Sequence, residues 1–286
     1  MNTTTIRVGG VPEHFNLPIH LAREQKLFET RGVSVEWTTY KGGTGQMIKA
    51  MADGEIDLCI LLTEGILNAI VKGSPLKIIS EYVTTPLTWG IHTGTDNPLD
   101  NYRDIYTKKY GISRFGSGSH LMAIVDANSN GHTLRNDQFE VVKNLDGALN
   151  SLGKLETDVF YWEKYTTKPW VNSGQLRRVG EYKTPWPCFV IAATDDILAR
   201  EPDNVIRILR TIHDSCDHFM QNDEAIKLVS DRFGQKLSDV ERWYHNTEWA
   251  IHGWVSEKML KSVIFHLRAA DIIGKEERIP ELIWRR

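Results

Sequence analysis

Short strand patterns alternate with helical patterns over the first 83 residues, and few folds accommodate such an alternation. The segment 56–62 is an almost uninterrupted apolar run, which is typical of a strand buried on both faces of a parallel sheet. Strands are expected at 6–9, 33–37, 56–62 and 76–83, and helices at 17–30, 47–51 and 67–71. Consecutive strand–helix units of this kind predict an α/β fold with helices over both faces of the sheet.

The same alternation starts again after residue 91. Strands are expected at 110–115, 139–142, 158–161 and 176–182, and helices at 119–127 and 145–152. The segment Thr184-Pro185-Trp186-Pro187 then predicts a stiff connector that returns to the first half, because each proline fixes its own φ and favours an extended residue before it. Beyond it the pattern becomes helical, at 203–220, 224–233, 237–250 and 256–269.

These patterns divide the 286 residues into two lobes. We expect a discontinuous first lobe made of residues 1–91 and 186–286, and a second lobe made of residues 92–185. A chain that leaves one α/β lobe, builds another and returns has natural hinges and a cleft between the lobes. In open α/β sheets, ligands bind outside the carboxyl ends of the strands.

Charge and composition exclude several classes of function. Lysine and arginine number 34 and aspartate and glutamate 37, a net charge of −3 that offers no basic surface for nucleic acid or for a membrane. No apolar run approaches the ~18 residues of a membrane helix. Cys59, Cys188 and Cys216 are too few and too scattered for a disulfide framework or a cysteine-rich zinc site. We therefore expect no metal and no cofactor.

The first residues carry no pattern of a secretory signal. Met1-Asn2-Thr3 has neither a basic segment nor an apolar core after it. The sequence therefore predicts a cytoplasmic protein. The alternative is a periplasmic or lipid-anchored extracellular protein whose leader has been removed.

The segment Gly116-Ser117-Gly118-Ser119-His120 lies between an expected strand and an expected helix. Unsatisfied backbone N–H groups and the positive end of the helix dipole favour an anion at such a position. Ser117, Gly118, Ser119 and His120 are therefore candidate ligand-binding residues. The alternative is that Ser119 merely caps the helix, which requires no ligand.

A second glycine-rich segment precedes a helix in the first lobe. Gly43, Thr44 and Gly45 are candidates for the same kind of anion contact, and the alternative is a flexible turn. Trp162 and Glu163 follow an expected strand, and Trp186 lies in the return connector. These three side chains are expected to line the cleft, although aromatic side chains also fill cores.

The remaining candidates are weaker. Five residues near the ends of first-lobe strands are included as lesser ligand-binding candidates: Pro12, His14, Thr63, Glu64 and Tyr82. Two clusters of metal-ligand types on expected helices are assigned instead to packing or solvent exposure: His245, Glu248 and His252, and His213, Cys216 and Asp217.

Five short motifs, in the correct order, resemble those of class II periplasmic-type substrate-binding proteins. The first covers residues 23–36 and ends in Gly32-Val33-Ser34-Val35-Glu36. The second is Gly42-Gly43-Thr44-Gly45, and the third is residues 51–58, which contain Gly54-Glu55-Ile56-Asp57. The fourth is the Phe115–Ser119 segment and the fifth is residues 159–165, where Lys164 occupies a position at which proline is common. The similarity covers residues 5–220 and is nearest to the sulfonate- and taurine-binding branch and the related thiamine-pyrimidine proteins of fungi.

This resemblance implies a two-lobed type II periplasmic-binding-protein fold, with hinge strands and an extra C-terminal helical segment. It also implies non-catalytic binding of a small anionic or zwitterionic metabolite in the cleft, with hinge closure. An ABC permease would be a partner only if the protein is exported. Two alternatives remain: an enzyme like those of thiamine-pyrimidine synthesis, whose cysteine-rich motif is absent here, and a ligand-dependent sensor.

Overall fold

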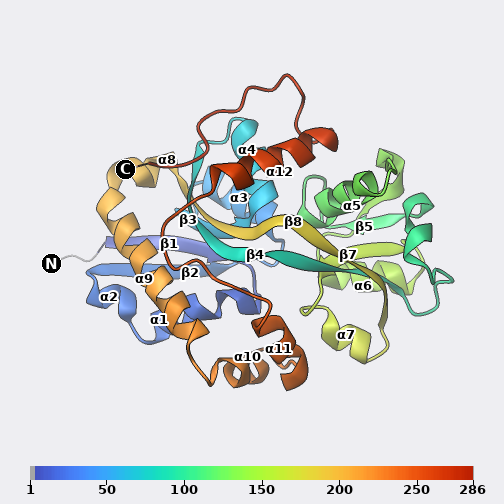
Figure 1. The fold of residues 1–286 in the computed structure, drawn as a ribbon, viewed down its shortest axis with the longest axis horizontal. Coiled ribbons are helices and arrows are strands. Elements are labelled where there is room, and N and C mark those ends of the chain that lie inside the picture. The colour runs from blue at the N-terminus through green and yellow to red at the C-terminus, as the bar shows by residue number, and fades with distance from the viewer. Residues whose placement is uncertain (1–3, 286) are drawn as a thin grey trace. The chain divides into compact units, whose positions relative to one another are not determined.

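The computed structural model describes residues 4–285, which form two compact units (Figure 1). Unit 1 consists of Met1–Thr85, Pro187–Lys261 and Glu276–Arg286, and unit 2 of Pro86–Trp186 and Ser262–Lys275. Residues 262–275 therefore group with unit 2, whereas the sequence analysis places all the C-terminal helices in the first lobe. Each unit has its own α/β architecture.

The sheet of unit 1 has the strand order β2-β1-β3-β8. Strands β1 (Thr4–Gly10), β2 (Val33–Thr39) and β3 (Leu58–Leu62) are parallel, with Val8 of β1 in register with Leu58 of β3. The last part of β8 (Leu176–Thr194) runs antiparallel to β3. Strand β3 and residues 188–193 of β8 are strongly apolar and buried, as is typical of strands that helices cover.

Helices connect and cover these strands. In chain order they are η1 (His14–Asn16), α1 (Leu17–Glu24), α2 (Leu27–Thr30), α3 (Thr44–Ala52), α4 (Thr63–Val71), α8 (Asp195–Arg200), α9 (Pro202–Met220), α10 (Ala225–Phe233) and α11 (Leu237–Tyr244). The long helix α9 packs on α1 and α2, and its apolar residues Val205, Ile208 and Ile212 are buried. Helix α12 (Glu257–Ala269) begins in unit 1 and ends in unit 2.

The sheet of unit 2 has the strand order β4-β7-β5-β6. Strands β5 (Tyr110–Ile112), β6 (Phe139–Val141) and β7 (Val159–Glu163) are parallel, and β4 (Leu76–Gly94) is antiparallel to β7. The connecting helices are η2 (Tyr102–Thr107), α5 (Gly118–Ser129), η3 (Asn136–Gln138), α6 (Leu145–Gly153) and α7 (Lys168–Asn172).

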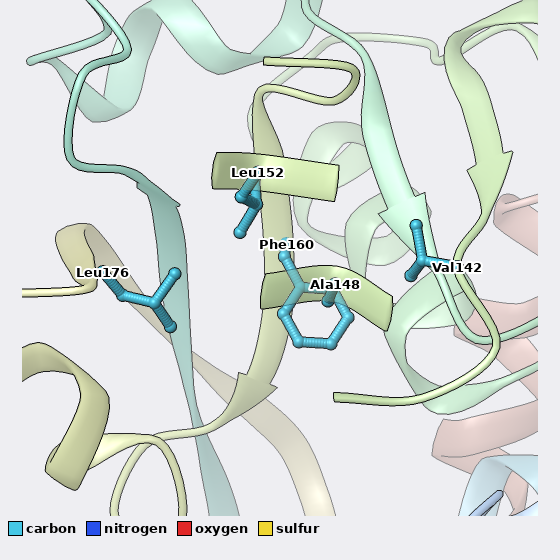
Figure 2. Close-up of a cluster of buried hydrophobic side chains, with 5 residues drawn as sticks. All are labelled: Val142, Ala148, Leu152, Phe160 and Leu176. Atoms are coloured by element: carbon cyan, nitrogen blue, oxygen red, sulfur yellow. The ribbon is translucent and has the colours of Figure 1, made fainter. Parts of the chain in front are cut away.

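An apolar cluster packs α6 against the strands of unit 2 (Figure 2). Ala148 and Leu152 of α6 meet Phe160 of β7 and Leu176 of β8, and Val142 closes the cluster beside β6. All five side chains are less than one-tenth exposed. Their burial fixes α6 on the face of the sheet toward which Phe160 points.

The helix expected over residues 17–30 is interrupted. Lys26 has a left-handed backbone (φ 56°), so α1 ends at Glu24 and α2 begins at Leu27. The apolar stripe explains the break: Leu17 and Leu21 are one turn apart, but the next turn carries only polar residues at 24 and 25.

The helix expected over residues 237–250 ends early, at Tyr244. The following segment extends along β4 instead: Ala250 N donates to Tyr82 O (2.9 Å), and the Trp249 indole N–H donates to Phe15 O (3.0 Å). Tertiary pairing thus overrides the helical pattern. His245, Glu248 and His252 therefore do not share a helix face.

Other boundaries differ by a few residues. The strand expected over 110–115 ends at Ile112, and the one expected from residue 56 begins at Leu58. Trp162 and Glu163 belong to β7 rather than following it, and the connector around Pro185 is part of the continuous strand β8. The short helix α8 has no counterpart in the sequence analysis.

Candidate functional site

The carboxyl ends of β1, β2 and β3 lie on one edge of the unit 1 sheet, because the three strands are parallel. The segment Val11–His14 follows β1, the glycine-rich segment around Gly43 follows β2, and α4 begins directly after β3. The first-lobe candidates other than Tyr82 are therefore on the edge where ligands of α/β proteins bind. Tyr82 lies within β4, is fully buried, and donates its hydroxyl to Phe15 O (2.8 Å).

The segment from Gly43 to Gly45 is fixed in place by Thr44. Gly43 has φ +68°, a conformation that favours glycine, and Thr44 starts α3. Thr44 Oγ1 accepts a hydrogen bond from Leu62 N (3.2 Å), which ties the segment to the end of β3. A Cβ on Gly65 would lie 2.4 Å from Thr44 Cγ2, so that glycine permits the close approach of α4. The Thr44 hydroxyl keeps its proton for donation.

Thr63, Glu64 and His14 are buried in unit 1. The Thr63 hydroxyl donates to Pro187 O (2.7 Å), which joins the start of α4 to β8, and Glu64 follows it in the first turn of α4. The His14 ring stacks on the ring of Phe15. It also meets the Trp243 ring edge-on, with the centroids of His14 and Trp243 4.1 Å apart. Burial lowers the pKa of His14 to about 3, so the ring is neutral at pH 7. Pro12 is exposed.

In unit 2, the turn from Ser113 to His120 joins β5 to α5. Ser117 is the N-cap of α5, and its Oγ accepts from His120 N (3.4 Å) and from Arg114 N (3.4 Å). Ser119 Oγ accepts from Ser113 N (3.0 Å), and the two serine hydroxyls bond to each other at 3.0 Å. Ser117 thus caps α5, and the hydroxyls of Ser117 and Ser119 also hold the turn together. Only one of the two hydroxyl protons is used in the bond between the serines, which leaves the other for a ligand.

His120 braces the same turn. Its Nδ1 accepts from Gly116 N (3.0 Å), so the proton of the neutral ring is on Nε2. Burial lowers the pKa of His120 to about 4. The ring meets Phe115 and Phe139 edge-on, with centroids 5.2 and 4.6 Å away. His120 therefore holds the turn in its observed shape.

Two further residues of this turn have properties that suit ligand binding, and the sequence analysis does not include them. Arg114 is the one cation between Ser113 and His120, and it is half-buried at the carboxyl end of β5. Phe115 is 53% exposed, beside the buried His120. Their place between an expected strand and a glycine-serine motif is the sequence signal that points to them.

Trp162 and Glu163 have opposite surroundings, because consecutive residues of a strand face opposite sides of the sheet. The Trp162 ring stacks on Phe160, with ring centroids 5.2 Å apart, and packs against the apolar cluster of unit 2. Glu163 is 3% exposed, and its Oε2 accepts from Thr166 N (2.6 Å), while burial raises the pKa of this carboxyl. The structure does not bring this pair together. Trp186 is also buried, 5.6 Å from the ring of His266.

Of the two clusters of metal-ligand residue types, His245, Glu248 and His252 are exposed, whereas His213 and Cys216 are parts of the core. His213 bonds to the buried Ser80 at 2.9 Å, and Cys216, one turn away on α9, is fully buried. Within residues 4–285, no group of three or more histidine, cysteine, aspartate and glutamate side chains is arranged to hold a metal ion. No helix among these residues is long and apolar enough to cross a bilayer.

The family comparison concerns unit 2. Residues 89–182 match the Ca3427-like PBP family. No curated protein matches the sequence.

Solved structures extend the similarity to nearly the whole chain. The CA3427 gene product of Candida albicans, described as having the generic periplasmic binding protein fold, is 24% identical, with a TM-score of 0.90 over 99% of this chain and 98% of that one. The alkanesulfonate-binding protein SsuA of Xanthomonas axonopodis pv. citri, solved with MOPS, is 17% identical (TM-score 0.82; 99% and 98% covered). The periplasmic aliphatic sulphonate-binding protein SsuA of Escherichia coli is 16% identical (TM-score 0.70; 98% and 92% covered). The expected type II periplasmic-binding-protein fold and the resemblance to this group are confirmed.

Proposed function

We propose that this protein binds a small anionic or zwitterionic metabolite, without altering it, through the turn 113–120 of unit 2 and the segment 43–45 of unit 1. The observation that carries the proposal is the construction of the turn around Ser117. Its hydroxyl, with that of Ser119 and the ring of His120, accepts hydrogen bonds from backbone N–H groups of the turn. The turn is therefore held in one shape before a ligand arrives, which lowers the entropic cost of binding.

A turn of this kind favours an anion. It opens α5, a helix of 12 residues, whose first N–H groups and dipole carry partial positive charge. Arg114 adds a full positive charge in the same turn, and its guanidinium stays protonated at pH 7 although burial lowers its pKa. Anionic groups with several acceptor oxygens, such as a sulfonate, match this set of donors.

The segment in unit 1 supplies the second contact of the proposal. The Thr44 hydroxyl can donate, and the first turn of α3 presents further N–H groups beside it. We propose that β4 and β8 act as hinges, since the chain passes between the units in both strands, at Thr85/Pro86 and at Trp186/Pro187. Closure would then bring both segments to one ligand and exclude water, which strengthens each hydrogen bond.

We further propose that the ligand belongs to the sulfonate class. The names of two similar proteins refer to sulfonates, and one of these proteins was solved with MOPS. The exposed Phe115 ring suits a ligand with an apolar or cationic part next to its anionic group. Taurine, MOPS and the pyrimidine precursor of thiamine are the probes that separate this class from the thiamine-pyrimidine alternative.

The test is calorimetric titration of these three compounds into the protein and into Arg114→Gln. Loss of a charge-assisted hydrogen bond costs about 1.5–3 kcal/mol, so Arg114→Gln should raise the Kd of the bound sulfonate about tenfold to hundredfold. Arg103→Gln is the matched control, because it removes the same charge from an exposed position of η2 in the same unit. Binding that is equally strong in both variants would contradict the proposal, as would preference for the uncharged pyrimidine.

A further inference from the structure

A cavity of about 560 Å³ lies within unit 1, between α9 and the helices α1 and α2 on which α9 packs. Its volume is within the range of sites that hold small molecules, about 300–1,000 Å³. The cavity lies where the helix expected over residues 17–30 is interrupted, since Gln25 and Leu27, on either side of Lys26, both line it. None of the ligand-binding candidates named above is among its lining residues. It is therefore a separate feature of unit 1.

One wall of the cavity is mostly apolar. Pro18, Leu21 and Ala22 of α1 and Leu27 of α2 contribute to it. Pro18 and Ala22 are buried, and Leu21 and Leu27 are half-buried. Phe219, which is buried on α9, adds an aromatic ring to the lining. Such a surface suits the apolar face of a flat ring, because contact with the ring removes both surfaces from water.

The opposite wall comes from one face of α9 and is polar. Thr211, Asp214, Ser215 and His218 line the cavity, and their spacing of three, four and seven residues places them along a single stripe of the helix. Thr211 and Ser215 are buried, whereas Asp214 and His218 are exposed. The cavity therefore has an apolar side and a polar side.

The polar groups of α9 offer acceptors to a ligand. Thr211 Oγ1 donates its proton to Arg207 O (2.8 Å), and Ser215 Oγ donates its proton to Thr211 O (2.7 Å). Each hydroxyl oxygen therefore has only lone pairs left for a ligand. His218 Nδ1 donates to Asp214 O (2.6 Å), so Nε2 is the acceptor of the neutral ring.

The charges at the cavity neutralise each other. Arg31, which follows α2, pairs with Asp214 of α9 through Oδ2, so Oδ1 of the same carboxylate is left as a further acceptor. The amides of Gln25 and Asn222 also line the cavity and can donate or accept. A ligand acid would face the lone pairs of the α9 stripe, whereas a ligand amine or amidine would donate to them. The lining thus favours a ligand that carries donors.

We propose that this cavity is a second ligand site, which takes a flat aromatic or heteroaromatic molecule with an amino or amidino group on one edge. The ring lies against the apolar wall of α1 and α2, and the N–H groups donate to Asp214, Ser215 and His218 on α9. The proposal does not depend on the anion contact of the proposed function, because the two share no residue and the cavity lies inside unit 1.

The test is amide NMR of the ¹⁵N-labelled full chain with two probes of similar shape and opposite charge. Benzamidine is a cation with N–H donors, and benzoate is an anion with acceptors only. We expect benzamidine to shift the amides of residues 18–31 and 211–222 and to leave those of Gly43–Gly45 and Gly116–His120 unchanged. Benzoate should not shift the amides of the cavity. A larger effect of benzoate on these amides, or no effect of benzamidine, would overturn the inference.

Substitutions on α9 locate the contact. Asp214→Asn should raise the Kd of benzamidine about tenfold or more, because it removes a charged acceptor. Asp217→Asn is the matched control: it removes the same charge from the same helix, and Asp217 accepts from Gln221 Nε2 (2.7 Å) and does not line the cavity. An unchanged Kd in Asp214→Asn, or an equal rise in Asp217→Asn, would overturn the inference.

Ser215→Ala decides the matter if Asp214→Asn does not fold, because it removes an acceptor and leaves the ion pair of Arg31 in place. A rise in the Kd of benzamidine of about twofold to tenfold would support the site, and an unchanged Kd would exclude it. Neither probe is a ligand of the proposed function, so a failure of taurine or MOPS to bind would contradict that function alone.

Discussion

The carboxylate of Asp126 is a buried acidic group of unit 2 that several side chains hydrogen-bond. Asp126 lies on α5 and is fully buried. Its carboxylate accepts hydrogen bonds from the hydroxyls of Tyr102 and Tyr161, and a third from Asn130 Nδ2 at 2.9 Å. Burial raises the pKa of Asp126, and the three donors oppose that shift. Through Tyr161, on β7, the carboxylate fixes α5 to the sheet and so positions the turn 113–120 at the other end of this helix.

Asp126→Ala should therefore destabilise the fold strongly. The substitution leaves Tyr161 with a buried hydroxyl and no acceptor, and we expect the free energy of unfolding to fall by about 3 kcal/mol. Urea denaturation at pH 7 measures this change. Asp104→Ala, at an exposed position of η2, is the matched control and should change the value by less than about 0.5 kcal/mol. An equal effect of both substitutions would show that the buried network does not stabilise unit 2.

At the scale of single residues, the sequence identified the residue types of the turn before α5 but not their hydrogen-bond partners. Ser117 and Ser119 were correctly placed at a helix start, yet their hydroxyls brace the turn. The partner of a hydroxyl depends on the path of the backbone over several residues, which residue type alone does not specify. For the same reason, Trp162 and Glu163 resembled a joint ligand surface although a strand directs them apart.

At the scale of elements, a buried histidine joins α9 to β4 in unit 1. Ser80 Oγ donates to Glu81 O (2.6 Å), so His213 Nε2 donates to Ser80 Oγ (2.9 Å). Burial, and secondarily the charge of His252, lower the pKa of His213 to about 4. The unfolded chain, with a histidine pKa of about 6.5, binds a proton more readily than the folded one. This group therefore stabilises the fold above pH 6.5 and loses that contribution as the pH falls toward 4.

His213→Asn isolates this effect. We expect the difference in unfolding free energy between the unchanged protein and the variant to be constant above pH 6.5 and to shrink by up to about 3 kcal/mol between pH 6.5 and pH 4. Chemical denaturation at several pH values measures it. A difference that does not depend on pH would mean that His213 titrates normally in the folded protein.

Most elements follow from periodicity, and the exceptions have physical causes. The early end of α11 could not be predicted from residues 237–250, because their pattern is helical and the competing hydrogen bonds come from Tyr82 and Phe15, far away in sequence. The break at Lys26 was detectable in principle, since the apolar stripe is missing for one turn. Hydrogen bonds between segments far apart in the sequence therefore cannot be predicted from a local pattern, whereas a gap in an apolar helical stripe is visible in that pattern.

At the scale of the whole molecule, the two α/β patterns and the return strand were sufficient to predict two α/β lobes. The resemblance carried by the motifs between residues 23 and 165 added the type II periplasmic-binding-protein fold, which the solved structures confirm. The assignment of residues 262–275 to unit 2 was not predictable, because an apolar stripe on a helix indicates a buried face without indicating which unit buries it.

Backbone amide NMR tests whether one small anion contacts both the turn at Gly116 and the segment at Gly43. Taurine or MOPS, whichever binds, is titrated into the ¹⁵N-labelled protein. We expect the amides of Gly116–His120 and Gly43–Gly45 to shift together, with one shared Kd, while those of the turn glycines Gly131 and Gly174 do not shift. Shifts confined to one of the two segments, or two different Kd values, would mean that the two segments do not bind one ligand.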